Sequence, residues 1–487
     1  PDGSEVAFVL RGEVFVTSTE FGDTRRITTT PEQERSVSFS PDGRRLLFAG
    51  EREGSWNLYE ATLPGTKKDT PHFFSAAQVN IKTLLKNGRE NYQPRYSPDG
   101  KEVAYLENRT TLKVLNLASG QQRVVMPGDM SYSYSDDDQW FDWSPDGRWL
   151  LVNFIDRQRW SSEVGLFDAH GKAPMVNLTK NGFEDFHPLW VQGGRAMIWA
   201  SDRAGLRATG GLVQQDVYAM FLTREAFDRF RLDKADFAQL QKQEEEDKKA
   251  ADDKKAAGKK AGAAEEAPAA AEPLKFELDG IDERTVRLTP NSGQLRGLAM
   301  TPDGEVLYVA LQTAEHVELW VVRLRAKESR RLAQLPAGKP EGGGDPIDLV
   351  LDAKGETAYL LNDGGITKFK LPKGGEGDVK AEPLRFAAEL RVDRAAERAH
   401  LFEHVWRQTR EKLYVADMGG VDWAGYRRAY ERFLPHISNS WDFTEMLSEM
   451  LGELNVSHTG SGYRARPPGA DATASLGLFF DEAFTAA

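Results

Sequence analysis

A short turn motif recurs along the first two thirds of this 487-residue chain and constrains its fold more than any other feature. Ser-Pro-Asp-Gly occurs at 40–43, 97–100 and 144–147, Thr-Pro-Asp-Gly at 301–304, and Pro-Asp-Gly at 1–3. Proline presets the first angle of the turn, aspartate hydrogen-bonds to nearby backbone, and glycine adopts the positive φ that ends it. Each copy therefore predicts a tight reversal between two β-strands.

Strand-like runs surround these turns. Residues 37–39 and 46–49 flank the first full copy, and 56–59 supply a third strand. Weaker copies at 190–194 and 351–355 bring the number of units to seven. Four short strands in each unit are typical of a propeller blade. The sequence thus predicts a mainly β fold: a β-propeller of about seven blades over residues 1–385, followed by a small α-helical subdomain over 386–487.

The spacing of the units breaks between 190 and 302. Within this interval, residues from about 232 to 275 form a charged, low-complexity stretch whose apolar content after 240 is almost entirely alanine. Such a stretch cannot bury enough surface to pack as a core. We expect a solvated helical or disordered insertion in the propeller.

Overall composition excludes several classes of function. A formal net charge of −12 disfavours nucleic acid as a partner, because a polyanion is repelled. The chain has no cysteine, so disulfides and thiolate metal sites are excluded. No apolar window is long enough to predict a membrane span.

After residue 385 the apolar residues recur at helical spacing. This pattern predicts helices over 393–413, 423–434 and 443–454, with Asp442 as the cap of the third and Glu445 completing a capping box. Ser457 and His458 follow the third helix directly. A histidine can accept and donate a proton near neutral pH, so this pair is the candidate catalytic site.

Four segments occur here in a characteristic order: 402–406 (Phe-Glu-His-Val-Trp), 421–423 (Val-Asp-Trp), 445–447 (Glu-Met-Leu) and 452–458 (Gly-Glu-Leu-Asn-Val-Ser-His). Together with the turns, they make the chain resemble the tricorn-type serine peptidases of the S41 family, which carry TolB-like, WD40-like propellers. The resemblance implies that His458 is the general base and that Ser457 orients it. It also implies that the nucleophilic serine and a glutamate belong to a later subdomain beyond a PDZ domain, so the chain would be a fragment that is inactive alone.

The function that follows from this resemblance is serine-type proteolysis of oligopeptides, with the propeller controlling access to the active site. The resemblance further implies peptide substrates, a homo-oligomer of six subunits, no cofactor, and a cytoplasmic location with the periplasm as the alternative. We predict no metal site, because the acidic run at 135–138 is typical of a solvated loop. The competing hypothesis is a non-catalytic, TolB-like propeller that binds or scaffolds other proteins. Two other hydrolase classes are disfavoured, because Leu401 interrupts the zinc-binding pattern of His400 and His404 and no Gly-x-Ser-x-Gly elbow occurs.

Overall fold

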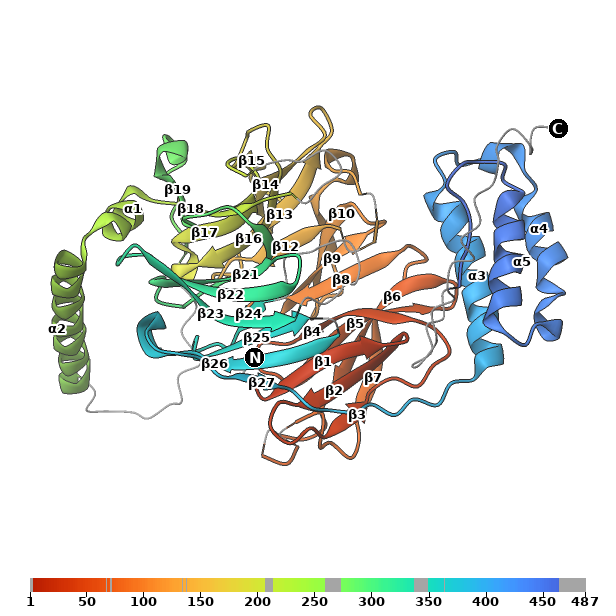
Figure 1. Ribbon diagram of the computed structural model, residues 1–487, viewed down its shortest axis with the longest axis horizontal. Helices are drawn as coiled ribbons and strands as arrows, with labels where there is room; N and C mark the ends of the chain where they lie inside the picture. Colours follow the sequence, from red (N-terminus) through yellow and green to blue (C-terminus); the bar gives the residue numbers. More distant parts are fainter. Residues whose placement is uncertain are drawn as a thin grey trace, which may run out of the picture. The chain divides into compact units, whose positions relative to one another are not determined.

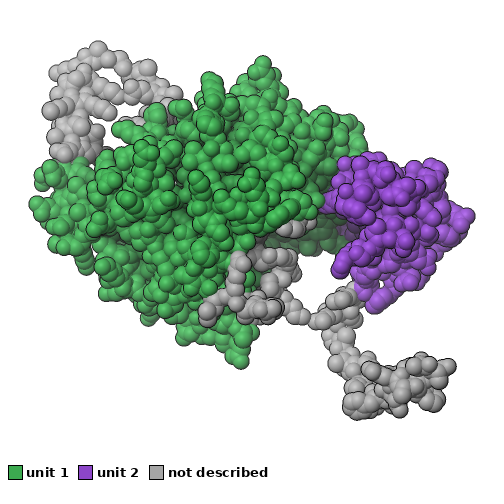
Figure 2. Space-filling model, turned by 90° about the horizontal axis from the view of Figure 1, so that it is seen from above, with its two compact units in different colours: residues 1–389 green, residues 390–487 purple. Residues whose placement is uncertain are grey.

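The computed structural model describes residues 3–66, 68–70, 72–133, 135–136, 138–205, 213–258, 273–336, 349–362 and 364–463. The chain divides into two compact units, residues 1–389 and 390–487, which are coloured separately in Figure 2. Pro1 and Asp2 of the first predicted turn lie outside the described residues.

The described part of the first unit forms seven antiparallel sheets, one of three strands and six of four (Figure 1). In the first three sheets the strands are β1 (Glu5–Leu10), β2 (Glu13–Ser18) and β3 (Thr24–Arg26); β4 (Glu34–Phe39), β5 (Arg45–Arg52), β6 (Ser55–Thr62) and β7 (Asn80–Leu85); and β8 (Asn91–Tyr96), β9 (Glu102–Glu107), β10 (Thr111–Asn116) and β11 (Gln122–Met126). In the fourth and fifth sheets they are β12 (Trp140–Trp143), β13 (Trp149–Asp156), β14 (Ser161–Asp168) and β15 (Val176–Asn177); and β16 (Asp185–Val191), β17 (Ala196–Ser201), β18 (Asp216–Phe221) and β19 (Thr285–Arg287). In the last two they are β20 (Gln294–Met300), β21 (Val306–Gln312), β22 (His316–Arg323) and β23 (Glu328–Pro336); and β24 (Leu349–Leu351), β25 (Thr357–Asn362), β26 (Gly365–Lys370) and β27 (Ala381–Pro383).

These sheets are the blades of a propeller, as the turns predicted. The first strand of each blade is innermost, since β4 lies beside β8, β12 beside β16, and β20 beside β24. The first and seventh blades are also neighbours. Tyr359 on β25 donates a hydrogen bond to the Gly3 carbonyl (3.1 Å), and the ring of Phe386 lies 5.0 Å from that of Phe8 on β1. The prediction of a seven-bladed propeller is confirmed.

Each Ser-Pro-Asp-Gly turn is closed by one repeated set of hydrogen bonds. In the third blade the Ser97 hydroxyl donates to the Asp99 carboxylate (2.7 Å) and accepts from the backbone N–H of Glu102 (3.0 Å). The same carboxylate accepts from the N–H of Lys101 (3.1 Å), and Gly100 has a φ of +68°. Corresponding bonds form in the copies that begin at Ser40, Ser144 and Thr301. These four turns therefore join the first and second strands of their blades in one geometry.

Neighbouring turns also pack on one another. A Cβ added to Gly100 would lie 3.7 Å from Pro41 of the preceding blade, and one added to Gly147 would lie 3.7 Å from Pro98. A contact of this length is an ordinary van der Waals distance, so the positive φ is the reason that these two positions require glycine.

Two helices interrupt the fifth blade between its third and fourth strands. They are α1 (Arg224–Arg231) and α2 (Lys234–Gly258), and α2 covers the first part of the predicted insertion. Residues 259–272 of that insertion lie outside the described residues. Arg325 of the sixth blade fixes the start of α2, because its guanidinium lies 3.6 Å from the ring centroid of Phe237 and pairs with Glu305 at 2.8 Å.

In its described part, residues 390–463, the second unit contains three α-helices, α3 (Arg394–Lys412), α4 (Trp423–Glu431) and α5 (Ser440–Gly452), with short 3-10 turns at Met418–Gly420 and Leu434–His436. The predicted helices are confirmed in number and order, although the second ends three residues earlier than expected. The predicted cap of the third helix was wrong. Asn439 caps α5 by accepting from the N–H of Asp442 (2.9 Å), and Asp442 lies in the first turn of the helix.

The helices of this unit enclose a small apolar core made of Phe402, Met418, Trp423, Phe443, Met446, Leu447, Met450, Leu451 and Leu454. Two tryptophans join α3 to α4 by reciprocal hydrogen bonds. The indole of Trp406 donates to the Trp423 carbonyl (3.0 Å), and the indole of Trp423 donates to the Trp406 carbonyl (2.9 Å). This pairing gives both indole N–H groups, of the buried Trp423 and the half-buried Trp406, a hydrogen-bond acceptor and joins the two helices.

Candidate functional site

The predicted catalytic pair lies in a loop that follows α5. Leu454 is buried in the apolar core and anchors the start of this loop. Asn455 then adopts a left-handed conformation (φ 49°) and directs the chain away from the helix axis, as is common after a helix C-terminus. Glu453, at the end of the helix, accepts a hydrogen bond from the Tyr430 hydroxyl (2.9 Å). Burial and this hydrogen bond raise the pKa of Tyr430 to about 12, so the phenol remains a donor at neutral pH.

Hydrogen bonds on the far side of the pair return the loop to α5. The Ser448 hydroxyl donates to the Ser461 carbonyl and accepts from the Ser461 N–H, both at 2.9 Å. The Thr459 hydroxyl donates to the Val456 carbonyl (3.1 Å). The loop from 455 to 461 is therefore held at both ends.

Ser457 and His458 occupy the tip of this loop, and both are exposed. His458 has a φ of +62°, in the left-handed region that is uncommon for non-glycine residues but that histidine enters more often than most. Among the described residues, neither side chain has a hydrogen-bond partner. The imidazole is thus presented outward by a strained and anchored backbone, an arrangement that leaves both ring nitrogens open to a group from elsewhere.

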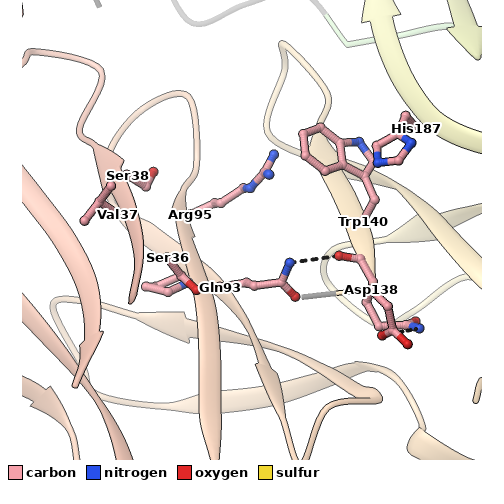
Figure 3. A pocket seen from close by; sticks show the side chains of 10 residues that line it. Ser36, Val37, Ser38, Gln93, Arg95, Asp138, Trp140 and His187 are labelled. Carbon is pink, nitrogen blue, oxygen red and sulfur yellow. Dashed lines mark hydrogen bonds between the residues drawn. The ribbon is translucent and has the colours of Figure 1, made fainter. Parts of the chain in front are cut away.

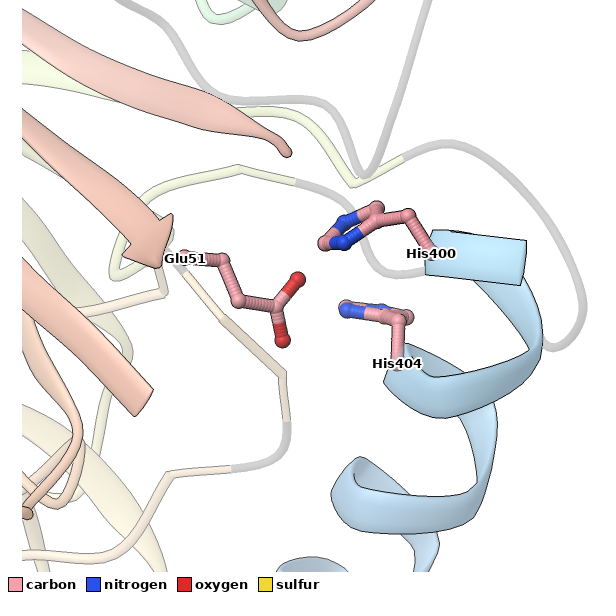
Figure 4. Close-up of side chains that lie close together, drawn as sticks. All are labelled: Glu51, His400 and His404. Carbon is pink, nitrogen blue, oxygen red and sulfur yellow. The ribbon is translucent and has the colours of Figure 1, made fainter. Parts of the chain in front are cut away.

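His400 and His404 lie on one face of α3, one turn apart, with ring centroids separated by 6.2 Å (Figure 4). Leu401, which stands where a zinc peptidase has its glutamate, belongs to the margin of the apolar core of the second unit. The side chain at that position therefore contributes packing and cannot act as a base.

The propeller contains a second candidate site that the sequence analysis did not identify. Two adjoining cavities of about 200 and 430 Å³ follow the inner strands and share Arg95, Trp140 and His187. The smaller begins at the level of Ser36 and Asp138, where the inner strands start. The larger extends to Pro302 and Asp352 at the repeated turns. Figure 3 shows Arg95, Trp140 and His187 gathered from three neighbouring inner strands.

Bulges in the inner strands aim side chains into this channel. The ladders of β4, β8 and β16 each shift register at one place, and the residues there are Ser36, Gln93 and His187. All three have a positive φ, between 48° and 58°. Left-handed backbone at a non-glycine residue costs roughly 1–3 kcal/mol, and such strain is concentrated at functional sites. The left-handed conformation recurs at the bulge of three inner strands, and in each blade it directs a side chain to the same cavity.

Opposite charges face each other across two neighbouring blades of the channel. The guanidinium of Arg95 lies 4.0 Å from the ring centroid of Trp140 and donates to the Phe141 carbonyl (3.1 Å). Asp142 accepts from the backbone N–H of Trp190 (3.4 Å). Burial lowers the pKa of Arg95 and raises that of Asp142, and each effect is opposed by the attraction between the two groups.

A signal for this site was present in the sequence. Arg95 and Asp142 stand two positions before the serine of their turns, and Gln93 and Trp140 stand four positions before it. Because the turn fixes the register of the inner strand, these offsets identify the residues that face the channel. Pro94 and Pro188 are a further signal, since proline within a strand marks a bulge or an edge.

Comparison with known proteins shows which proteins this chain resembles. The family model for the Tricorn protease C1 domain matches residues 394–452, which include all of α3, α4 and α5. Tricorn protease homolog 1 of Streptomyces coelicolor is 30% identical over 142 residues, which cover 26% of this chain and 13% of that protein. A crystal structure of the tricorn protease aligns with 95% of this chain and 41% of its own, with a TM-score of 0.66 and 14% identity. The resemblance to the tricorn-type proteases is confirmed.

The tricorn-type matches cover only part of each relative, and the C1 match ends before the predicted catalytic pair. At 14% identity, the crystal structure shows the fold alone: a seven-bladed propeller followed by helices. The Tol-Pal system protein TolB of Bordetella parapertussis is also 30% identical over 143 residues, which cover 23% of this chain and 32% of that protein. The chain thus spans well under half of each of these relatives. Ser457 and His458 lie beyond residue 452, where the C1 match ends, so their catalytic roles remain predictions.

The compartment also remains a prediction. Among the described helices, none is both long and apolar enough to cross a bilayer.

Proposed function

We propose that this chain is part of a serine-type peptidase that degrades oligopeptides, with the propeller limiting access to the active site. The observation that carries the proposal is the C1 match over the three helices that present the Ser457–His458 loop. Residues 386–487 are then the N-terminal part of the peptidase core, and the propeller occupies residues 1–385.

In this proposal His458 is the general base. A serine hydroxyl is a weak nucleophile until an imidazole removes its proton, and the imidazole works well only when another group fixes its tautomer. Ser457 is the neighbour that orients His458 through its hydroxyl. The nucleophilic serine comes from another part of the complete protein, in agreement with the outward position of the ring.

The test uses the complete protein that carries this chain and a fluorophosphonate probe, which labels activated serines. We expect His458→Ala to abolish labelling and to lower kcat by roughly 10⁴-fold or more, as removal of a catalytic histidine does elsewhere. Ser457→Ala should cause a smaller loss together with a shifted pH profile of kcat. His436→Ala is the matched control, because His436 is an exposed histidine of the same unit. Equal labelling of the His458→Ala and His436→Ala variants would refute the assignment.

A non-catalytic binding module is the second candidate, and the similarity to TolB favours it. Under that hypothesis the complete protein shows no probe labelling that depends on His458. The peptidase proposal also includes assembly into a homo-oligomer, a hexamer by family resemblance, which light scattering of the complete protein would test. A monomer at micromolar concentration would contradict that part.

A further inference from the structure

The channel of the propeller contains two opposite charges that are close to each other but do not form an ion pair. Both side chains line the larger cavity, and the attraction between them perturbs both groups. Within the described residues, however, no nitrogen of Arg95 lies within 4.0 Å of an Asp142 oxygen. Charges removed from water normally pair directly, because an unpaired buried charge is costly.

The structure shows what keeps the two groups apart. Stacking on Trp140 and the hydrogen bond to Phe141 hold the guanidinium of Arg95 flat against the wall of the channel. Asp142 is held by the backbone of Trp190, which belongs to the next blade. Each charge is therefore held by the blade that follows its own, and both groups line the larger cavity.

Most of the hydrogen-bonding capacity at this place is unused. A guanidinium has five N–H groups, and among the described residues Arg95 uses one of them, toward Phe141. A carboxylate can accept about four hydrogen bonds. Both side chains keep part of their surface exposed, and that surface faces the cavity they line. A ligand at this position meets donors on one side and acceptors on the other.

We propose that this part of the channel binds an extended peptide by its main chain, with a peptide carbonyl accepting from Arg95 and a peptide N–H donating to Asp142. The choice of a peptide rests on the proposed function. The choice of its main chain rests on the site, because the peptide group is neutral and carries one donor and one acceptor.

The charge of the surroundings disfavours a simple anion as the ligand. The positive charge of Arg95 is balanced by Asp142, and Asp138 lines the adjoining cavity. The shape of the channel favours an extended chain. The two cavities share their lining along the inner strands, and the larger, at about 430 Å³, lies within the ~300–1,000 Å³ range of ligand sites. Trp140 supplies a flat aromatic wall beside the proposed path.

The experiment measures binding to this chain by calorimetry, with an N-acetylated and C-amidated alanine–serine hexapeptide as the probe. Arg95→Met and Asp142→Asn should each weaken binding about tenfold, the effect of losing one hydrogen bond to a charged group. Arg148→Met is the matched control, because Arg148 also stacks on a tryptophan, Trp149 at 5.3 Å, but is exposed and lines neither cavity. Unchanged affinity in both channel variants would overturn the proposal.

A second measurement uses the unmodified chain, so that a variant that fails to fold does not leave the proposal untested. The same blocked peptide carrying a benzophenone should crosslink to the strands that line the larger cavity, β8, β12, β16, β20 or β24, and mass spectrometry would locate the modified residues. Crosslinks confined to other strands or to the second unit would overturn the proposal. So would a requirement for a free C-terminal carboxylate, or displacement of the peptide by acetate, since either result would make Arg95 an anion site.

These outcomes separate this inference from the proposed function. If the chain does not bind the peptide but the complete protein still shows probe labelling that depends on His458, only the proposed channel site is refuted. If the chain binds the peptide but no labelling depends on His458, the proposed peptidase function is refuted and the propeller is a peptide-binding module.

Discussion

The serine hydroxyl at the base of each repeated turn allows a quantitative test of how the propeller is held together. In the third blade Ser97 is 2% exposed, and its hydroxyl forms two hydrogen bonds, one to Asp99 and one from the Glu102 N–H. A hydrogen bond contributes about 1 kcal/mol net. Ser97→Ala should therefore lower the free energy of unfolding by about 2 kcal/mol. Urea unfolding of the whole chain, followed by both circular dichroism and fluorescence, would measure this loss and check that the transition is two-state.

Ser161 provides a control for the loss of a buried hydroxyl. It is 5% exposed, and its hydroxyl has no hydrogen-bond partner among the described residues. Ser161→Ala should cause no loss of stability, because it breaks no hydrogen bond and removes a buried polar group that has no partner. If the two variants lose equal stability, the hydrogen bonds of the turn are not what Ser97 contributes.

The same turn predicts a dependence on pH. Burial alone would raise the pKa of Asp99, but hydrogen bonds from Ser97 and from the Lys101 N–H outweigh it, and the pKa is lowered. A carboxylate whose pKa is lower in the folded state contributes stability that is fully present above its unfolded pKa, about 3.9, and is lost as the pH falls through the folded value. The stability difference between the unmodified chain and Ser97→Ala should therefore narrow below about pH 4. A constant difference down to pH 2.5 would show that the charge of Asp99 is not involved.

Three further predictions concern other parts of the chain. Asn439→Ala should lower the free energy of unfolding by about 1 kcal/mol and Asp442→Ala by less, because Asn439 is the cap of α5. Thermal unfolding would rank the two variants. If Asp442→Ala were the less stable, Asp442 would be the cap, as the sequence predicted. Glu102→Gln should lower stability at pH 7 by up to about 1 kcal/mol, because hydrogen bonds from Arg123 outweigh burial and lower the pKa of Glu102. The loss should become smaller as the pH falls from the unfolded pKa of the carboxyl through its lower folded pKa. Denaturation at pH 7 and pH 3 would measure both losses, and an equal loss at the two pH values would contradict the pairing. His458→Gly should be about 1 kcal/mol more stable than His458→Ala, because glycine accepts a φ of +62° without strain. Urea unfolding would compare the two variants. Equal stability would indicate that the backbone at 458 leaves the left-handed conformation when alanine is present.

The architecture could be predicted because its decisive interactions are local. The bonds that close each turn connect residues no more than five apart, from Ser97 to Glu102. Such bonds depend on a few consecutive side chains, so four letters of sequence were enough to place a strand reversal. Seven reversals with strand-like flanks then left a propeller as the natural arrangement. The helices of the second unit were predictable for a similar reason, since the spacing of Phe402, Met446 and Met450 reflects one buried face on each helix.

The cap of α5 shows where local reasoning fails. Asn439 and Asp442 are both good caps, and they are three residues apart. In the structure the Asn439 side chain accepts from the Asp442 N–H and donates to the Asp442 carboxylate (2.7 Å), so the two residues form one reciprocal cap. The sequence contained the pair, and the prediction used only its second member. The helix consequently starts at Ser440, three residues before the predicted start.

The channel residues were missed for a different reason. No short sequence motif contains the channel residues Arg95, Asp142 and His187, because they come from three blades and are about 45 residues apart. Only the fold brings them together. Their common feature is a fixed offset from the turn, and this offset acquires meaning only once the inner strand of each blade is known.

Strained backbone connects the two candidate sites. His458 on the loop after α5 and Ser36, Gln93 and His187 in the propeller all hold a left-handed conformation that their residue types disfavour. In each case the surroundings impose the strain: hydrogen bonds from Ser448 hold the loop, and bulged ladders hold the inner strands. Propensity-based reasoning predicts what a residue prefers, so it is least informative where the fold overrides that preference. Other non-glycine residues of the described chain also have positive φ, so what distinguishes Ser36, Gln93 and His187 is that they share one bulge position in three blades and line one cavity.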